Sequence, residues 1–280
     1  MSETFSFDTL FQYSRAVTPY LDGRLKSAKQ ASDASEQGSD VSTKQSNQVS
    51  DTPANQKQLT TSYFPEVTYG IPCSQAIKTL YDSLAEASPE AKQAYWLTRT
   101  WGLLCWQPLY LSFISIYACH GLPKIKDMSQ DLRKQFIAGY QFNDEEVRVD
   151  EQNALIQIAA TELHLLFDFY REEIGEWARI RPGFTNHLFA DAILGCIVQF
   201  QQFQPDIPNS YFLEQAKIWF IATGLPLSSL QGLTVNPETN KLHLIRTSCC
   251  LVYKCTGRKL CSDCPKLPEN KEMKIALKAS

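Results

Sequence analysis

Residues 101–118 read WGLLCWQPLYLSFISIYA, an apolar run nearly long enough to span a membrane as a helix. Gln107, Pro108, Ser112 and Ser115 interrupt this run, its C-terminal side lacks a basic flank, and the chain has no second run like it. A helix that is apolar all round and lies outside a membrane is buried in a protein core. We therefore expect a buried helix, bent at Pro108, and no transmembrane segment.

Helical spacing of apolar side chains continues on both sides of this run. The predicted helices cover residues 74–87, 89–119, 151–177, 186–203 and 210–223, with a short amphipathic helix within residues 1–25.

Two segments have the composition of β-strands rather than helices. One is residues 136–142, and the other is a hairpin near residues 233–246, where apolar segments flank the turn residues 236–240. We therefore expect an α+β fold, a predominantly helical body with a small β element that leads into a cysteine-rich C-terminal loop.

Residues 27–62 are mostly polar and contain no aromatic residue. Such a segment buries too little apolar surface to offset the entropy lost on ordering, so we predict a disordered tether. The chain then divides into an N-terminal helix (1–26), the tether, a mainly helical substrate-binding body (63–232) and a C-terminal region (233–280).

The overall composition is that of an ordinary globular protein. The 280 residues are 44% hydrophobic and 20% charged, with a net charge of −3. This length buries a core without disulfide staples, and the near-balanced charge argues against a dedicated nucleic-acid binder. No basic stretch followed by an apolar run opens the sequence, so we expect a cytoplasmic, reduced chain.

Five of the nine cysteines, Cys249, Cys250, Cys255, Cys261 and Cys264, lie close together near the C-terminus. Such a cluster in a reducing compartment is typical of a metal or iron–sulfur site, because thiolates are soft ligands. Zinc favours pairs spaced as Cys261 and Cys264 are, whereas adjacent cysteines have diverging Cβ vectors. The spacing favours a [2Fe–2S] cluster, with zinc as the alternative.

The motif Cys249-Cys250, ten residues and then Cys261-x-x-Cys264 resembles the C-terminal signature of the FhuF-like ferric-siderophore reductases. This resemblance implies that the four cysteines ligate a [2Fe–2S] cluster that passes single electrons to siderophore-bound Fe(III) in the cytoplasm. Two features depart from the family pattern: Cys255 within the ten-residue spacer, and the polar insertion at residues 27–62. Cys255 leaves room for an exchange of cluster ligands.

The other cysteines and the histidines have simpler interpretations. Cys105, Cys119 and Cys196 lie in apolar helical segments and are expected in the core, and Cys255 is expected to be a non-ligating thiol. Cys73 has no assignment. Four thiolates complete an all-cysteine cluster, so we expect no histidine ligand.

The last forty residues carry nine basic and three acidic side chains, a net charge of +6. This charge offsets that of the thiolates and is expected to raise the reduction potential of a cluster. Lys254, Arg258 and Lys259 are expected to guide an acidic ferredoxin or an anionic ferric siderophore, although a solvated basic tail explains them equally well. Six other residues could line a substrate groove, although surface charge or core packing explains each of them more readily. They are Arg99, Arg179, Arg181, Trp96, Trp101 and Trp106.

The sequence therefore predicts an oxidoreductase, a ferric-siderophore reductase that releases Fe(II) for iron assimilation. Hydroxamate or catecholate oxygens are hard donors that hold Fe(III) more firmly than Fe(II), so one electron loosens the complex without a catalytic residue beyond the cluster. The chain has no glycine-rich dinucleotide motif, which implies an external donor such as a ferredoxin. The alternatives are a zinc-stabilised interaction module and an iron- or redox-sensing iron–sulfur protein.

Overall fold

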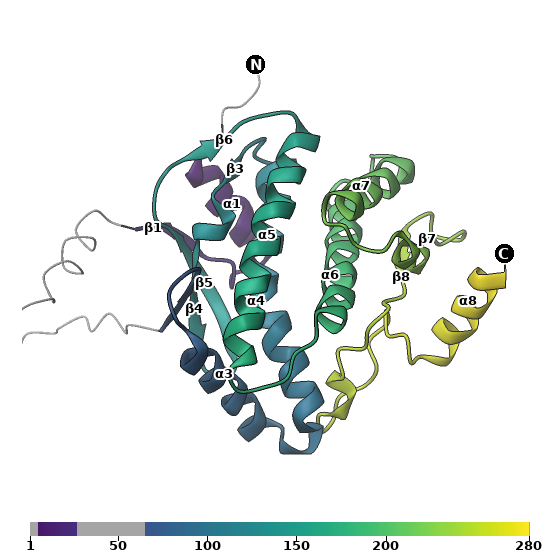
Figure 1. Ribbon diagram of the computed structural model, residues 1–280. Helices are drawn as coiled ribbons and strands as arrows, with labels where there is room; N and C mark the ends of the chain where they lie inside the picture. The colour runs from purple at the N-terminus through teal and green to yellow at the C-terminus, as the bar shows by residue number, and fades with distance from the viewer. Residues whose placement is uncertain (1–4, 27–64, 280) are drawn as a thin grey trace, which may run out of the picture.

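A computed structural model of the chain describes residues 5–26 and 65–279. The fold is α+β with helices predominant, as the sequence predicts (Figure 1). The helices are α1 (Phe7–Val17), α3 (Ser74–Ala87), α4 (Lys92–Tyr117), α5 (Gln152–Gly175), α6 (Pro182–Phe203), α7 (Asn209–Ala222) and α8 (Pro268–Ala279). The strands are β1 (Gly23–Leu25), β2 (Glu66–Thr68), β3 (Leu122–Pro123), β4 (Ser129–Arg133), β5 (Phe136–Phe142), β6 (Val147–Arg148), β7 (Leu233–Val235) and β8 (Leu242–Leu244).

A four-stranded sheet packs on one side of the helices (Figure 1). Its strand order is β1-β5-β4-β2, with β1 parallel to β5 and the other pairs antiparallel. Strands β3 and β6 form one separate antiparallel pair, and β7 and β8 form another. The sheet thus joins a strand that precedes residues 27–64 to strands that follow them.

Helix α4 is the buried helix predicted from residues 101–118, and Leu104 and Leu109 within it are almost fully buried. Pro108 has no N–H, so it cannot donate to the carbonyl of Leu104 one turn earlier. Gln130 of β4 supplies the missing donor, because its Nε2 lies 2.9 Å from that carbonyl oxygen and 2.7 Å from the hydroxyl of Tyr170 on α5. One buried amide therefore links α4, the sheet and α5.

No helix within residues 5–26 and 65–279 combines the length and the apolar character needed to cross a membrane.

The sequence predicts only β5 among the strands of the four-stranded sheet. Strand β4 reads SQDLR, so its sequence shows no alternation of apolar and polar residues. Its polar side chains up to Asp131 are nevertheless buried, because they are paired. The Ser129 hydroxyl lies 2.7 Å from that of Thr68, and the Asp131 carboxylate accepts two 2.8 Å hydrogen bonds from Arg24. Paired polar groups can be buried without the loss that an unpaired group suffers, so hydrophobic periodicity misses this strand.

Helix boundaries follow the apolar periodicity closely, and β5 and the β7–β8 hairpin lie where the sequence predicts them. The helix predicted from residue 89 begins at Lys92, because Pro89–Ala91 form a 3-10 turn. Helix α6 begins earlier than predicted, at Pro182, a residue suited to the first helical turn. The sequence does not predict α8.

Helix α1 is the amphipathic helix predicted within residues 1–25. The Ser6 hydroxyl caps it by accepting a hydrogen bond from the Thr9 N–H at 3.1 Å. Leu10 is fully buried, and the ring of Phe7 lies 5.4 Å from that of Phe142 in β5. Helix α1 is therefore part of the main body, while the predicted tether, residues 27–62, lies outside the described residues.

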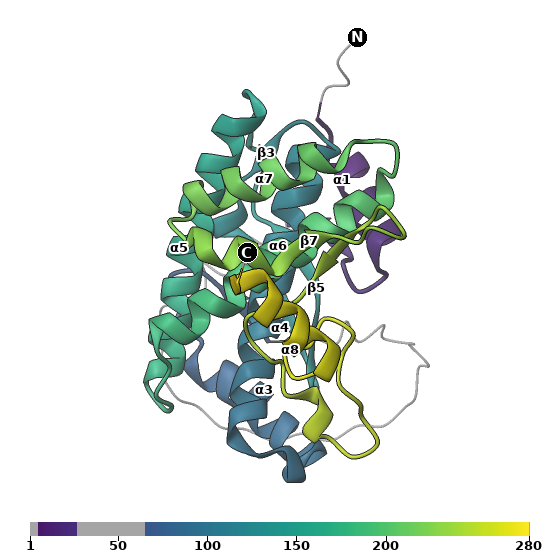
Figure 2. The same ribbon diagram turned by 90° about the vertical axis from the view of Figure 1, so that its right-hand side faces the viewer.

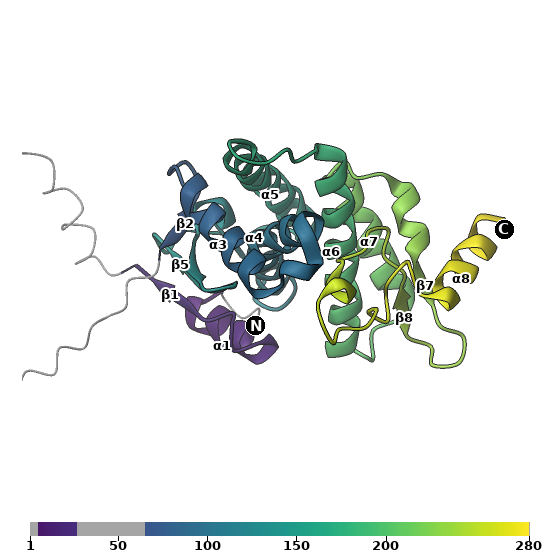
Figure 3. The same ribbon diagram turned by 90° about the horizontal axis from the view of Figure 1, so that it is seen from below.

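The C-terminal segment packs along α6 and then returns toward the start of α4 (Figures 1 and 2). The Gln201 side chain of α6 accepts a 3.0 Å hydrogen bond from the Leu242 N–H in β8. Further along, the Glu90 carboxylate accepts hydrogen bonds from the N–H and hydroxyl of Thr256. Seen from below, α4 lies between α1 with the sheet on one side and α6 with the C-terminal segment on the other (Figure 3).

Replacement of Leu10 by alanine tests the docking of α1. Removing a fully buried leucine side chain costs roughly 2–5 kcal/mol of unfolding free energy. We expect urea denaturation to show this loss for L10A. Q12A, an exposed change on the same helix, should leave the free energy of unfolding within about 0.5 kcal/mol of the parent. Equal stability of the two variants would contradict the docking of α1 on the core.

Candidate metal centre

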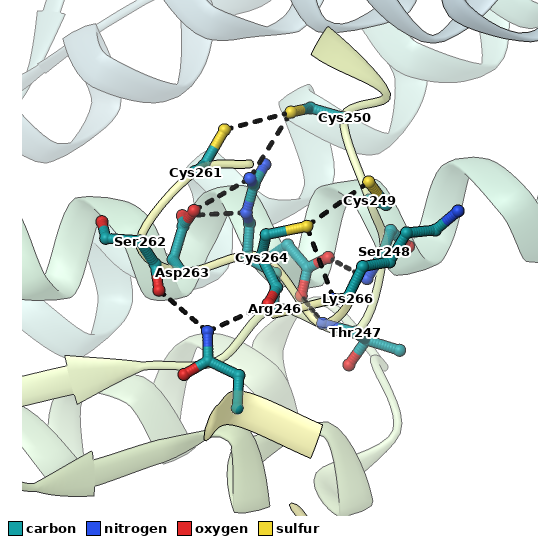
Figure 4. Close-up of polar contacts among 12 residues, drawn as sticks. Arg246, Thr247, Ser248, Cys249, Cys250, Cys261, Ser262, Asp263, Cys264 and Lys266 are labelled. Atoms are coloured by element: carbon teal, nitrogen blue, oxygen red, sulfur yellow. Dashed lines mark hydrogen bonds and ion pairs between the residues drawn. The ribbon is translucent and has the colours of Figure 1, made fainter. Parts of the chain in front are cut away.

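Cys249 and Cys250 follow strand β8, and Cys261 and Cys264 lie on a second segment that runs beside the first. A backbone hydrogen bond of 3.0 Å from the Arg246 N–H to the Asp263 carbonyl joins the two segments. The four thiols point toward one another across them (Figure 4). The structure therefore brings together all four cysteines of the predicted ligand set.

The four sulfur atoms form two close pairs. Cys249 Sγ lies 3.6 Å from Cys264 Sγ, and Cys250 Sγ lies 3.5 Å from Cys261 Sγ. Two thiolates bound tetrahedrally to one metal at about 2.3 Å lie roughly 3.8 Å apart, so each pair has a spacing near that of two ligands of one metal ion. The arrangement thus offers two ligands at each of two positions.

Among the described residues, no group of three or more His, Cys, Asp or Glu side chains is arranged to hold a metal ion. A structural zinc site needs four ligands around one centre. The two sulfur pairs match the two ligands per iron of a dinuclear centre, and their spacings also occur between the ligands of one zinc ion.

Backbone N–H groups turn toward two of the sulfurs. The Leu251 N–H donates to Cys249 Sγ at 3.4 Å, and the Lys266 N–H donates to Cys264 Sγ at 3.5 Å. Leu251 has a φ of 61°, a left-handed conformation that turns the chain directly after the two adjacent cysteines. These contacts stabilise negative charge on the sulfurs without any ionisable group.

Arg246 lies beside the Cys250 sulfur. Its Nε lies 2.8 Å from Asp263 Oδ2, its Nη2 donates to Asp263 Oδ1 at 2.9 Å, and the same Nη2 lies 3.5 Å from Cys250 Sγ. Burial alone lowers the pKa of Arg246, but Asp263 and Cys250 outweigh it and raise that pKa above its usual value. Arg246 therefore stays charged beside Cys250.

The thiols differ in acidity. Burial raises the pKa of Cys249, and it raises the pKa of Cys261 to about 11. Burial acts on Cys250 in the same direction, but the Val252 N–H and Arg246 outweigh it and lower its pKa below the ordinary value. Cys250 is therefore the thiol of these three that loses its proton most readily.

Side chains from two helices hold the cysteine segments in place. The buried Asp191 carboxylate of α6 accepts 2.6 Å hydrogen bonds from the N–H groups of Thr247 and Ser248. Burial raises the pKa of Asp191, and these two donors act against that rise. On α8, Asn270 donates through Nδ2 to the carbonyls of Ser262 and Cys264 at 2.8 and 2.9 Å.

Asp191 and Asn270 are functional candidates that the sequence analysis misses. A lone carboxylate within the apolar segment FADAILG is the one signal that points to Asp191. Nothing in the local pattern around Asn270 points to its contacts, because they depend on where α8 packs.

The remaining cysteines separate from this group. Cys105, Cys119 and Cys196 are buried, as predicted, and burial raises the pKa of each thiol. Cys73 is buried at the start of α3, where its N–H donates to Glu173. Cys255 is half-buried and lies against Tyr95 of α4.

The predicted docking residues lie on the loop between the two cysteine segments. Arg258 and Lys259 are exposed, and Lys254 is half-buried in a 3-10 turn. This loop follows the cysteine pair directly and reaches the start of α4 through Thr256. It places three cationic residues close in sequence to the sulfur pairs.

Loss of the Asp191 carboxylate is expected to loosen the first cysteine segment. A hydrogen bond to a charged group contributes about 1.5–3 kcal/mol, so D191A should speed amide exchange at Thr247 and Ser248 by roughly 10- to 100-fold. Hydrogen–deuterium exchange of a peptide spanning residues 245–250 measures this change. D206A removes an exposed carboxylate and serves as the control. Equal exchange in both variants would argue against the hydrogen bonds from Thr247 and Ser248 to Asp191.

Comparison with known proteins adds no family assignment. No protein-family model matches the sequence, and no solved structure matches the fold.

Proposed function

We propose that this chain is a ferric-siderophore reductase that binds a [2Fe–2S] cluster through Cys249, Cys250, Cys261 and Cys264. The observation that carries the proposal is the arrangement of the four thiols in two pairs with spacings of 3.5 and 3.6 Å. A [2Fe–2S] cluster takes four cysteine thiolates, two for each iron. The resemblance of the cysteine motif to that of the FhuF-like reductases supports the same conclusion.

The surrounding residues fit a redox role for such a centre. The cluster supplies one-electron transfer when it is bound. Arg246 places positive charge beside Cys250, and the Leu251 and Lys266 N–H groups donate to sulfur. Positive charge and hydrogen bonds at the sulfurs favour the more negative, reduced state and raise the reduction potential.

The substrate in this proposal is Fe(III) held by a hydroxamate or catecholate siderophore. Reduction by one electron weakens the hold of these hard oxygen donors and releases Fe(II). Lys254, Arg258 and Lys259 attract either an anionic ferric complex or an acidic electron donor such as a ferredoxin, in the cytoplasm. The half-buried or exposed positions of these three residues suit such an encounter.

Anaerobic purification and stopped-flow mixing test this function. We expect a red-brown protein with iron and acid-labile sulfide that gives an EPR signal after reduction and is reoxidised by ferric siderophores. C250S is expected to lose most of the iron and the visible absorbance. C255S is the matched control on the same loop and should retain both.

Two outcomes would contradict the proposal. A colourless protein that contains zinc and no sulfide would identify a zinc-stabilised module instead. A reduced cluster that neither a ferric hydroxamate nor a ferric catecholate reoxidises would leave an iron–sulfur protein without reductase activity, as expected for a sensor.

Replacement of Arg246 tests the electrostatic part of the proposal. R246Q removes positive charge beside Cys250 and leaves Asp263 unpaired, so the midpoint potential should fall by tens of mV, where 59 mV is about 1.4 kcal/mol for one electron. The double variant R246Q/D263N removes both charges and should shift the potential less. Redox titration followed by EPR measures both changes, and a potential that stays constant or rises in R246Q would refute the assigned role.

A further inference from the structure

Arg99 of α4 lies near the cysteine loop, because Cys255 of that loop contacts Tyr95, one helical turn before Arg99. Its guanidinium is half-buried, and its Cζ lies 5.8 Å from the centre of the Phe136 ring. Among the described residues it forms no hydrogen bond or ion pair, although a guanidinium carries five N–H donors. Arg246 differs, because Asp263 already matches its charge.

Further along α4, the helix face that carries Arg99 also carries the aromatic side chains of Trp106 and Tyr110. Arg99, Gly102, Trp106 and Tyr110 follow one another at helical spacing, so they share one side of the helix. The ring of Trp106 lies 6.0 Å from that of Phe136 and 5.8 Å from that of Tyr110. We call these five residues the aromatic shelf, and its three rings are half-buried.

Gly102 leaves open space in the middle of the shelf. It is exposed, and a Cβ built at this position meets no atom within 4 Å. Glycine inside a helix costs about 1 kcal/mol relative to alanine, so packing and helix propensity do not account for it here. The open space lies one helical turn from Arg99 and one turn from Trp106.

The far end of the shelf opens into a cavity. Tyr110 lines a cavity of about 520 Å³ between α1, α4 and α6, together with Tyr13, Ile114, Cys196 and Phe200. Its volume lies within the range of small-molecule sites. The shelf therefore runs along one face of α4 from Arg99 to an apolar cavity.

We infer that the aromatic shelf binds the substrate of the proposed reaction, and that this substrate is an anionic ferric chelate with aromatic donor groups, of the catecholate type. The inference rests on the proposed function. A ferric tris-catecholate is trianionic and carries aromatic rings, so it pairs with Arg99 and stacks on Phe136 and Trp106. A ferric tris-hydroxamate has an uncharged core without aromatic donor rings, and the desferrioxamine B complex is a monocation because of its terminal ammonium, so it gains neither interaction.

A chelate bound at Arg99 would lie near the cysteine loop, because Cys255 contacts Tyr95 one helical turn before Arg99. A [2Fe–2S] cluster held by the four cysteines would supply the single electron that converts Fe(III) to Fe(II), and the chelate would form no covalent bond with the protein. Arg99 acts here as a binding residue for the chelate.

Gallium(III) complexes separate binding from reduction, because gallium(III) is not reduced under these conditions. Quenching of tryptophan fluorescence in the purified holoprotein measures the affinity for gallium(III) enterobactin, a tris-catecholate, and for gallium(III) desferrioxamine B, a tris-hydroxamate. We expect the catecholate complex to bind at least tenfold more tightly. R99Q should weaken its binding at least tenfold, and R99K should recover part of it.

Two further variants keep the test independent of folding. G102L places a side chain in the open space with a good helix-forming residue, so it should retain the thermal midpoint and lose binding of the catecholate complex at least tenfold. R179Q removes an exposed arginine between α5 and α6 and should bind like the parent.

Equal affinity for the two gallium complexes, or unchanged binding in R99Q and G102L, would overturn the inference. Reoxidation of the reduced protein by ferric desferrioxamine B at the same rate in R99Q and the parent would leave the proposed function standing without this site. Arg99-dependent binding of gallium(III) enterobactin without reoxidation by any ferric complex would retain the site and reject the reductase.

Discussion

The position of α4 depends on the buried amide of Gln130. Pro108 removes one hydrogen bond from the middle of a helix that is surrounded by the core, and an unpaired carbonyl there is costly. The Gln130 Nε2 pairs with the Leu104 carbonyl and with the Tyr170 hydroxyl, so the helix, the sheet and α5 share one polar contact. The helix therefore runs through the core as far as its buried residues extend. Arg99, nearer its N-terminus, is half-buried and lies near the cysteine loop.

The cysteine segments have little regular secondary structure and take their shape from side chains of other elements. Asp191 binds the first segment from α6, Asn270 binds the second from α8, and Glu90 binds the loop between them from the start of α4. A metal centre needs its ligands fixed within narrow limits, and supports outside the ligand set provide this. The helices around the loop thus determine where the sulfurs lie.

Sequence periodicity predicts most of this fold because most of its helices bury apolar faces. It predicts β5 and the hairpin for the same reason, but it misses β4, where pairing of Asp131 with Arg24 permits burial. The pairing partner lies more than one hundred residues away in sequence, so no local pattern can report it. The proximity of the four cysteines is predictable because they lie close together in the sequence.

The supports of the candidate site are harder to predict for a related reason. Asp191 and Arg99 both lie in segments whose apolar periodicity predicts only helices packed in the core. The contacts of these two side chains depend on which parts of the chain pack against those helices. The lone carboxylate in an apolar helix is a usable signal, since such a group is rarely buried without a partner. Arg99 has no comparable signal, because an arginine on a helix is usually solvated.

The pairing of the cysteines follows from the geometry of adjacent residues. Cys249 and Cys250 direct their side chains apart, so they join different pairs, one with Cys264 and the other with Cys261. Each pair therefore takes one thiol from each segment. A metal at either pair would connect the two segments, and a dinuclear centre would connect them twice. Binding of such a centre would therefore stabilise the C-terminal region itself, since the free energy of metal binding adds to that of folding wherever the unfolded chain lacks the site.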